Sequence, residues 1–309
     1  MTTPLKAGVA GAGVFGGFHA RKYASLPGVQ LAAVYDVHAE RAQKLAGELS
    51  VRAFTDFAAF LEAAADVITV ASPAVAHAAE ARAALEAGRH VYVEKPIADQ
   101  IDQAHALVRL AQEKQLVLAA GHQEREVFQA MGLLGLPERP LRMEAVRRGV
   151  RSDRNLDVSV VLDLMIHDLD LALVLAACDA ERVDAEGSAP IGPGLDDCEA
   201  EVVFEGGMTA VFKASRVAEA RERTMHAVFP SGEVWLDFLT HEFSNTTPFA
   251  LDPAWAATDK GRDPLGASVA DFLAAVRGDI PRPLVTGDEA ARALELALRV
   301  EAAAAATYD

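Results

Sequence analysis

Short apolar runs alternate with segments of helical periodicity over the first 122 residues. Runs with the length and composition of buried strands lie at 5–10, 29–35, 66–71, 90–93 and 116–120. Helical patterns follow a glycine-rich turn after residue 10 and recur at 39–49, 75–88 and 104–113. The alternation predicts an α/β domain over residues 1–122, with a doubly wound parallel sheet covered by helices on both faces.

The pattern is different in the remaining residues, 123–309. A strand-like run at 141–148 is followed by an apolar helix and then by further strand-like runs at 199–204, 208–215, 226–229 and 233–239. The dipeptides Gly206-Gly207 and Ser231-Gly232 lie between consecutive runs and are typical of hairpins, which pair strands antiparallel. We therefore expect a second, α+β domain with an open, largely antiparallel sheet.

A helix expected over 160–174 carries three polar side chains on an otherwise apolar surface. Asp163, His167 and Asp170 are spaced by four and three residues, which places them on one face of an α-helix. A helix that is apolar nearly all round is normally buried, and a buried carboxylate beside a histidine orients and tunes the imidazole. The same pattern also fits an internally satisfied core network without any function.

A glycine-rich turn, Gly11-Ala-Gly-Val-Phe-Gly16, joins the first strand to the first helix. In a dinucleotide-binding Rossmann domain, Gly11 would permit the tight turn, Gly13 would let the phosphates approach, and Gly16 would let the helix pack on the strand. The diphosphate would lie at the helix N-terminus, beside Val14 and Phe15, where unpaired N–H groups favour an anion.

Asp36 follows the second strand, about 20 residues beyond the glycine turn. An acid at this position binds the ribose 2′-hydroxyl and repels a 2′-phosphate, which favours NAD over NADP. His38 and Arg41 could still tolerate a phosphate. Asp36 could instead cap the following helix.

Two further loops follow strands of the first domain, at the edge where doubly wound sheets bind ligands. One contains Ser72-Pro73 and, a turn later, His77; the other is Glu94-Lys95-Pro96. A lysine before a proline is usually a solvated turn residue. Here Lys95 comes almost directly after a buried strand, which makes it a candidate for the functional edge.

The formal net charge of −16, from 29 basic and 45 acidic residues, disfavours nucleic acid or an anionic membrane as a partner. The two cysteines are too few for a disulfide framework and lack metal-ligand spacing, so no metal site is expected. No apolar stretch of about 20 residues is present, and the N-terminus has no signal-peptide layout. We therefore expect a cytoplasmic protein.

Taken together, Gly11-x-Gly13-x-x-Gly16, Glu94-Lys95-Pro96 and Asp163-x-x-x-His167 resemble the glucose-fructose oxidoreductase and inositol dehydrogenase family of NAD(P)-dependent oxidoreductases. The resemblance covers essentially the whole chain in the same order. The amino-acid sequence at 160–170 is most similar to that of the subgroup that includes UDP-N-acetylglucosamine 3-dehydrogenases.

The resemblance implies an NAD-binding domain, 1–122, and a substrate-binding and oligomerisation domain, 123–309. It implies hydride transfer between nicotinamide and a hydroxyl-bearing carbon of a sugar or nucleotide sugar, with C3 of UDP-N-acetylglucosamine as the candidate carbon. It also implies a homodimer or homotetramer, because relatives pair subunits through the open sheet. Two other interpretations stay open: a catalytically inactive cofactor-binding sensor or scaffold, and a reductase of a non-sugar substrate such as an inositol-like polyol.

The resemblance also assigns roles to residues. Lys95, Asp163 and His167 would be the catalytic set, with Glu94 and the Ser72-Pro73 loop beside the nicotinamide. His167 would take the hydroxyl proton, Asp163 would orient its ring, and Lys95 would hydrogen-bond the same hydroxyl. The approach to the helix, 157–161, lacks the paired glycines of many relatives, which leaves the identity of the sugar open.

Five arginines gather between positions 142 and 154 of this acidic chain. They fit the solvated face of a strand, paired with acidic neighbours. Alternatively, Arg151 and Arg154 would clamp a substrate phosphate through bidentate guanidinium hydrogen bonds, with Asp170 as a further substrate contact.

Overall fold

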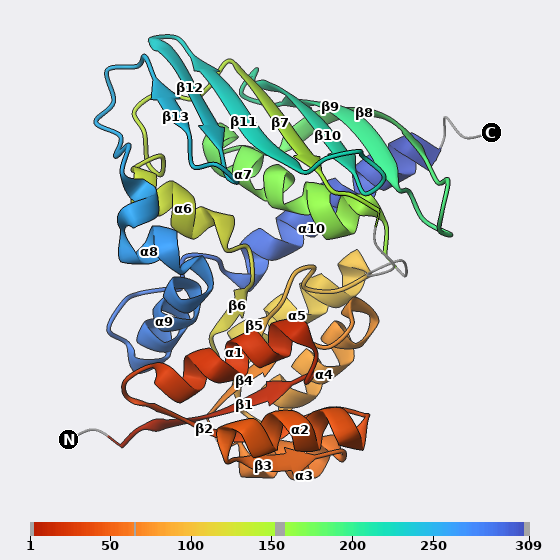
Figure 1. Cartoon of the computed structure of the whole chain (residues 1–309), viewed down its shortest axis with the longest axis vertical. Helices are drawn as coiled ribbons and strands as arrows, with labels where there is room; N and C mark the ends of the chain where they lie inside the picture. Colours follow the sequence, from red (N-terminus) through yellow and green to blue (C-terminus); the bar gives the residue numbers. More distant parts are fainter. Residues whose placement is uncertain (1–2, 65, 152–157, 306–309) are drawn as a thin grey trace. The chain divides into compact units, whose positions relative to one another are not determined.

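The computed structural model describes residues 3–64, 66–151 and 158–305. The chain forms two compact units (Figure 1). The first unit comprises Met1–Gln123 and Asp263–Ala291, and the second comprises Glu124–Arg262 and Arg292–Asp309.

A six-stranded sheet in the order β3-β2-β1-β4-β5-β6, with all neighbours parallel, forms the centre of the first unit. Its strands are β1 (Leu5–Ala10), β2 (Val29–Tyr35), β3 (Arg52–Phe54), β4 (Val67–Val70), β5 (His90–Val93) and β6 (Leu118–Ala120). The connecting helices are α1 (Val14–Ser25), α2 (Ala39–Leu49), α3 (Phe57–Ala63), α4 (Ala74–Glu86) and α5 (Ile101–Glu113). The predicted doubly wound parallel sheet is confirmed. The strand order reverses between β1 and β4, where sheets of this type bind their ligands.

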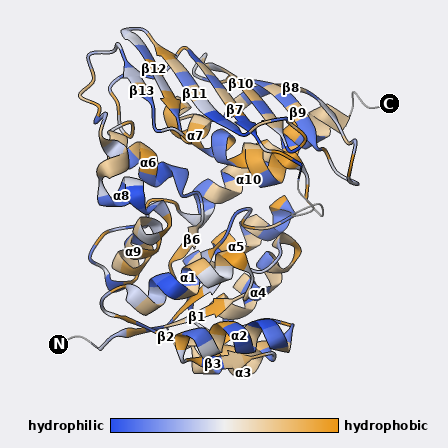
Figure 2. Ribbon diagram, in the orientation of Figure 1, coloured by the Kyte–Doolittle hydropathy of each residue, from blue (hydrophilic) through white to orange (hydrophobic). Residues whose placement is uncertain are grey.

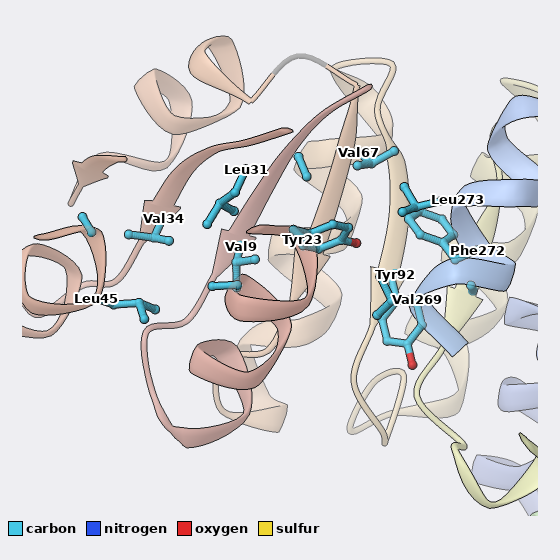
Figure 3. Packing of buried hydrophobic residues seen from close by; sticks show 14 residues of the cluster. Val9, Tyr23, Leu31, Val34, Leu45, Val67, Tyr92, Val269, Phe272 and Leu273 are labelled. Atoms are coloured by element: carbon cyan, nitrogen blue, oxygen red, sulfur yellow. The ribbon is translucent and has the colours of Figure 1, made fainter. Parts of the chain in front are cut away.

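The helix α9 (Pro264–Arg277) also belongs to the first unit, although it comes late in the chain. Figure 3 shows Val269, Phe272 and Leu273 of this helix beside Tyr92 of β5. The rings of Tyr92 and Phe272 lie 5.8 Å apart. The predicted division at 122/123 therefore misplaces 263–291, because apolar periodicity shows that a helix is buried but not against which sheet.

A seven-stranded sheet in the order β13-β12-β11-β7-β10-β9-β8 forms the second unit. Its strands are β7 (Arg142–Arg148), β8 (Ala180–Ser188), β9 (Asp197–Phe204), β10 (Thr209–Ser215), β11 (Glu222–Phe229), β12 (Gly232–Asp237) and β13 (Phe243–Asn245). Among the described strands of this sheet, only β7 and β10 pair in parallel, and both predicted hairpins, β9–β10 and β11–β12, are observed. The open, largely antiparallel sheet is thus confirmed.

Along β7, β9, β10 and most of β11, buried residues alternate with more exposed ones. Figure 2 shows hydrophilic and hydrophobic residues mixed along this sheet. The other elements of the second unit are α6 (Glu124–Met131), the π-helical turn η1 (Val161–Met165), α7 (Ile166–Ala176), the short turn η2 (Trp255–Ala257) and α8 (Asp259–Arg262). The helix α10 (Gly287–Ala305) begins in the first unit and ends in the second. In the described ranges, no helix combines the length and apolarity that a membrane crossing requires.

Candidate functional site

The glycine turn has the geometry that a dinucleotide requires. Gly11 has a φ of +93°, and a Cβ on Gly16 would lie 1.7 Å from the carbonyl oxygen of Gly11, so neither position accepts a side chain. A Cβ on Gly13 would meet nothing within 4 Å. Gly13 is the N-cap of α1, without a side-chain cap, and Val14 and Phe15 are largely exposed after it. The turn therefore offers N–H donors and open space to a diphosphate.

Asp36, at the end of β2, is buried and faces the same turn. Its carboxylate accepts hydrogen bonds from the backbone N–H groups of Ala12 and His38, both at 2.8 Å. The N-cap of α2 is His38, so Asp36 is not the helix cap that the sequence left open. Because a carboxylate offers about four acceptor positions, Asp36 can hold the turn and still accept a ribose hydroxyl.

His77 joins the two loops that follow β4 and β5. Its Nδ1 lies 2.7 Å from the carbonyl oxygen of Pro96, and its Nε2 lies 2.8 Å from that of Ser72. The ring is 2% exposed, and both nitrogens face backbone, so we assign it to holding the loops rather than to contacting a cofactor. The Ser72 hydroxyl donates to Glu80 at 2.7 Å, and Pro73 is the N-cap of α4.

Glu94 is buried beside the cis Lys95-Pro96 peptide bond. Its Oε1 lies 2.6 Å from Nε2 of His19 and accepts from Nε2 of Gln123 at 3.0 Å. Burial by itself raises the pKa of Glu94, but the hydrogen bond and charge of His19 outweigh burial and hold that pKa below its ordinary value. A Cβ at Gly121 would lie 2.7 Å from the carboxylate, which explains the glycine there.

Neither His19 nor Gln123 carries a sequence signal that points to this cluster. His19 lies on α1, three residues after Gly16, and Gln123 ends the first segment of the unit. Their spacing from Glu94 along the chain carries no periodic signal. Only the packing of α1 against β5 brings the histidine to the carboxylate.

In the second unit, His167 lies near the start of α7, with Nδ1 2.7 Å from Oε2 of Glu124. The other carboxylate oxygen of Glu124 accepts from Arg147 at 2.9 Å, and Arg147 makes two hydrogen bonds to Asp168, at 2.8 and 2.9 Å. Burial raises the pKa of Glu124, but His167 and Arg147 outweigh burial and hold that pKa well below its ordinary value. Glu124 precedes His167 by 43 residues, and no local pattern pointed to it.

The helix that carries His167 differs from the continuous α-helix expected over 160–174. Asp163 lies in the π turn η1, and α7 begins only at Ile166. A π turn changes the angles between successive side chains, and such turns are frequent at functional sites. Asp163 and His167 are half-buried.

Asp170, on the same helix, is paired with an arginine. It is 1% exposed and accepts two hydrogen bonds from the buried Arg125, at 2.6 and 2.8 Å. A carboxylate on this apolar helix needs a paired cation, and Arg125 supplies it. This pairing favours a structural role for Asp170, and the substrate contact expected for it stays a prediction.

The arginine cluster mostly has the structural role that the sequence left open. Arg147 is 2% exposed and is bound to Asp168 and Glu124, while Arg148, the last residue of β7, pairs with Glu222, the first residue of β11, at 3.1 Å. Arg151 is exposed, and Arg154 lies outside the described residues. The phosphate clamp stays a prediction. In the described part of the chain, no group of three His, Cys, Asp or Glu side chains could hold a metal ion.

Comparison with known families gives two matches. Residues 5–122 match the oxidoreductase family with an NAD-binding Rossmann fold, and residues 138–246 match the GFO/IDH/MocA C-terminal domain. The first range contains all strands of the sheet in the first unit, and the second range contains all strands of the sheet in the second unit.

Individual relatives match over the full length. UDP-N-acetylglucosamine 3-dehydrogenase of Acidithiobacillus ferrooxidans is 37% identical over 308 residues, 97% of each chain. A solved structure of that enzyme covers 100% of both chains, with 34% identity and a TM-score of 0.88. The WlbA dehydrogenase of Bordetella pertussis, in complex with NADH and UDP-GlcNAcA, is 18% identical, covers 98% of this chain and 97% of its own, and has a TM-score of 0.81. This last likeness concerns the fold alone.

Proposed function

Because the chain belongs to the GFO/IDH/MocA family of NAD-binding oxidoreductases, we propose that it oxidises a hydroxyl-bearing carbon of a sugar or nucleotide sugar. The proposed substrate is UDP-N-acetylglucosamine, at its C3 hydroxyl, because the full-length relative is named for that reaction. One observation supports catalysis over mere cofactor sensing. Besides the glycine cradle, the chain has a histidine, His167, whose Nδ1 is held by an ionised carboxylate. A pure binding protein needs no such base.

In the proposed reaction, His167, Lys95 and Asp163 have separate roles at the substrate hydroxyl. A nicotinamide cofactor held by the glycine turn and Asp36 would supply the hydride acceptor. Nε2 of His167 takes the hydroxyl proton, which suits an imidazole with an ordinary pKa of about 6.5. The ammonium of Lys95 donates to the same oxygen and favours its alkoxide character, and Asp163 adds negative charge near the imidazolium. The substrate thus loses a proton and a hydride and becomes a ketone.

The glycine cradle and Asp36 support NAD as the preferred cofactor. A carboxylate that is anchored by two backbone N–H groups cannot swing away from a 2′-phosphate, so NADP would meet a fixed negative charge. Backbone contacts from 11–16 would hold the diphosphate.

The decisive assay follows NADH absorbance while UDP-sugars, free sugars and inositols are offered with NAD. We expect turnover with UDP-N-acetylglucosamine. Turnover with free polyols alone would overturn the nucleotide-sugar assignment and the arginine clamp. No turnover with any of them, despite tight NADH binding, would favour the cofactor-binding sensor.

Two variants test the assigned chemistry. His167→Ala and Lys95→Met should each lower kcat by about 10² to 10⁴, the range that a positioned acid or base contributes. Glu222→Gln, on the sheet of the second unit, is the control and should retain full activity. Wild-type turnover in either of the first two variants would contradict the assignment of that residue.

We also propose a homodimer or homotetramer that pairs through the open sheet of the second unit. The support for this proposal is the family resemblance, in which the open sheet pairs subunits; here the more exposed face of that sheet carries the ion pairs Lys213–Glu144 and His226–Glu233. Sedimentation equilibrium tests this, and a monomer at micromolar concentration would contradict it. The cytoplasmic location stays a prediction.

A further inference from the structure

A carboxylate at the first residue of α6 contacts the proposed base. Glu124 binds His167 through one oxygen and Arg147 through the other, at 2.7 and 2.9 Å. The side chains of Glu124 and His167 are 16% and 15% exposed, and that of Arg147 is 3% exposed. The contact is therefore a partly dehydrated, directed hydrogen bond rather than a mobile surface ion pair.

The charges around this contact come from several elements of the second unit. Carboxylates are supplied by Glu124 of α6, Asp163 of η1 and Asp168 of α7, and guanidinium groups by Arg147 of β7 and Arg223 of β11. Arg147 donates hydrogen bonds to both Glu124 and Asp168 and so neutralises part of their negative charge. None of these hydrogen bonds involves His167. The arrangement keeps Glu124 ionised and aimed at the ring.

The orientation of the contact has a chemical consequence. A carboxylate can only accept, so the Nδ1 that faces it carries the hydrogen. The ring then exchanges protons through Nε2, and each imidazolium formed during turnover keeps an anionic partner 2.7 Å away. In a base–orienter pair of this kind, the orienter fixes both the tautomer and the direction of the base.

We propose that Glu124 is the positioning residue of the base His167, in the role that resemblance gives to Asp163. The inference rests on the proposed function, since it assumes that His167 is the base. It makes Glu124 and Arg147 parts of the proton-handling site, although neither contacts the substrate.

The test replaces Glu124 by Gln, which keeps the shape and removes the charge. We expect kcat to fall by about 10²-fold, the lower end of a general base's contribution. The KM for substrate and the Kd for NADH should change little, because Glu124 contacts neither. The acid limb of the kcat profile should move to lower pH by about one unit or more, because the imidazolium loses an opposite charge.

Glu124→Asp provides the second variant. It keeps the charge but shortens the reach, so kcat should fall while the acid limb stays closer to the wild-type position than in Glu124→Gln. Glu222→Gln is the surface control. Nitrogen-15 NMR of labelled histidine reads the tautomer without turnover: His167 should carry its proton on Nδ1 in the wild type and lose that preference in Glu124→Gln.

The outcomes separate the two proposals. If His167→Ala is inactive while Glu124→Gln keeps wild-type kcat and pH profile, the role of Glu124 is wrong and the proposed function stands. If His167→Ala is itself fully active, the proposed function loses its base. Should Glu124→Gln fail to fold, a wild-type Nε2–H tautomer of His167 would still overturn the inference.

Discussion

The two units present functional groups in different ways. In the first unit, the backbone forms the candidate cofactor cradle: Gly11 and Gly16 are required because any Cβ would collide with neighbouring main chain. In the second unit, side chains form the proton-handling site, through a line of charges from His167 over Glu124 and Arg147 to Asp168. A site made of backbone therefore requires glycine at fixed positions in a short stretch of sequence. A charge network requires only that distant elements bring side chains of opposite charge together.

Removal of Arg147 should have the largest effect on stability. Arg147→Met leaves two carboxylates, Glu124 and Asp168, without their shared cation, so the free energy of unfolding should fall by about 3–5 kcal/mol. Arg148→Met, the next residue on the same strand, loses only an exposed ion pair and should cost at most about 1 kcal/mol. Urea denaturation measures both. Equal losses of unfolding free energy in the two variants would show that the buried ion pairs of Arg147 stabilise the protein no more than the exposed pair of Arg148.

The glycine turn allows a sharper test of the first unit. Gly16→Ala should destabilise the protein by about 1–3 kcal/mol, because its Cβ would overlap the Gly11 carbonyl. Gly13→Ala should leave the thermal midpoint nearly unchanged, since its Cβ meets no atom within 4 Å, yet it should weaken NADH binding. Fluorescence titration and calorimetry separate the two effects. Undiminished NADH affinity in Gly13→Ala would place the diphosphate elsewhere.

Asp36 should control cofactor preference with a moderate effect. In Asp36→Asn the fixed negative charge disappears while an acceptor oxygen remains, so the ratio of kcat/KM for NADP over NAD should rise roughly tenfold, about 1.4 kcal/mol. Steady-state kinetics with both cofactors measures the ratio. An unchanged ratio would mean that Asp36 only holds the glycine turn.

The smallest expected effect is on acid stability. The pKa values of Glu94 and Glu124 lie below the ordinary 4.5 in the folded protein, so their ionised forms stabilise it above that pH. This contribution is lost as the pH falls below 4.5 towards the folded-state values. Glu94→Gln should therefore be less stable than wild type at pH 7, and the gap should narrow in acid. A gap that is constant with pH, in urea denaturation at several pH values, would contradict this.

Much of the fold could be read from periodicity. All five strand runs expected in the first 122 residues correspond to strands of the parallel sheet, and the dipeptides Gly206-Gly207 and Ser231-Gly232 marked both hairpins of the other sheet. Local residues also cap two helix starts: Asp263 accepts from the N–H of Gly266, and Thr286 and Glu289 bind each other's backbone N–H. Short edge strands such as β3 were missed, because three half-exposed residues carry little pattern.

The candidate site was only half predictable. Asp36 and the glycine turn lie together, as their spacing predicts, but no sequence signal pointed to the pairing of Asp170 with Arg125 or to that of His167 with Glu124. The spacing of Asp163, His167 and Asp170 marked the polar residues of an otherwise apolar helix. It could not tell which acid faces the histidine and which faces a buried arginine.

The amino-acid sequence alone determined the two sheet types, the glycine cradle and the identity of the candidate base, because each depends on local sterics or on a short repeat of apolar positions. Tertiary structure decided that α9 packs on the parallel sheet, that His19 partners Glu94, and that Glu124 partners His167. The two side-chain pairs join residues that are 75 and 43 positions apart. A buried charge must find an opposite charge, but only the packing of whole elements selects which one.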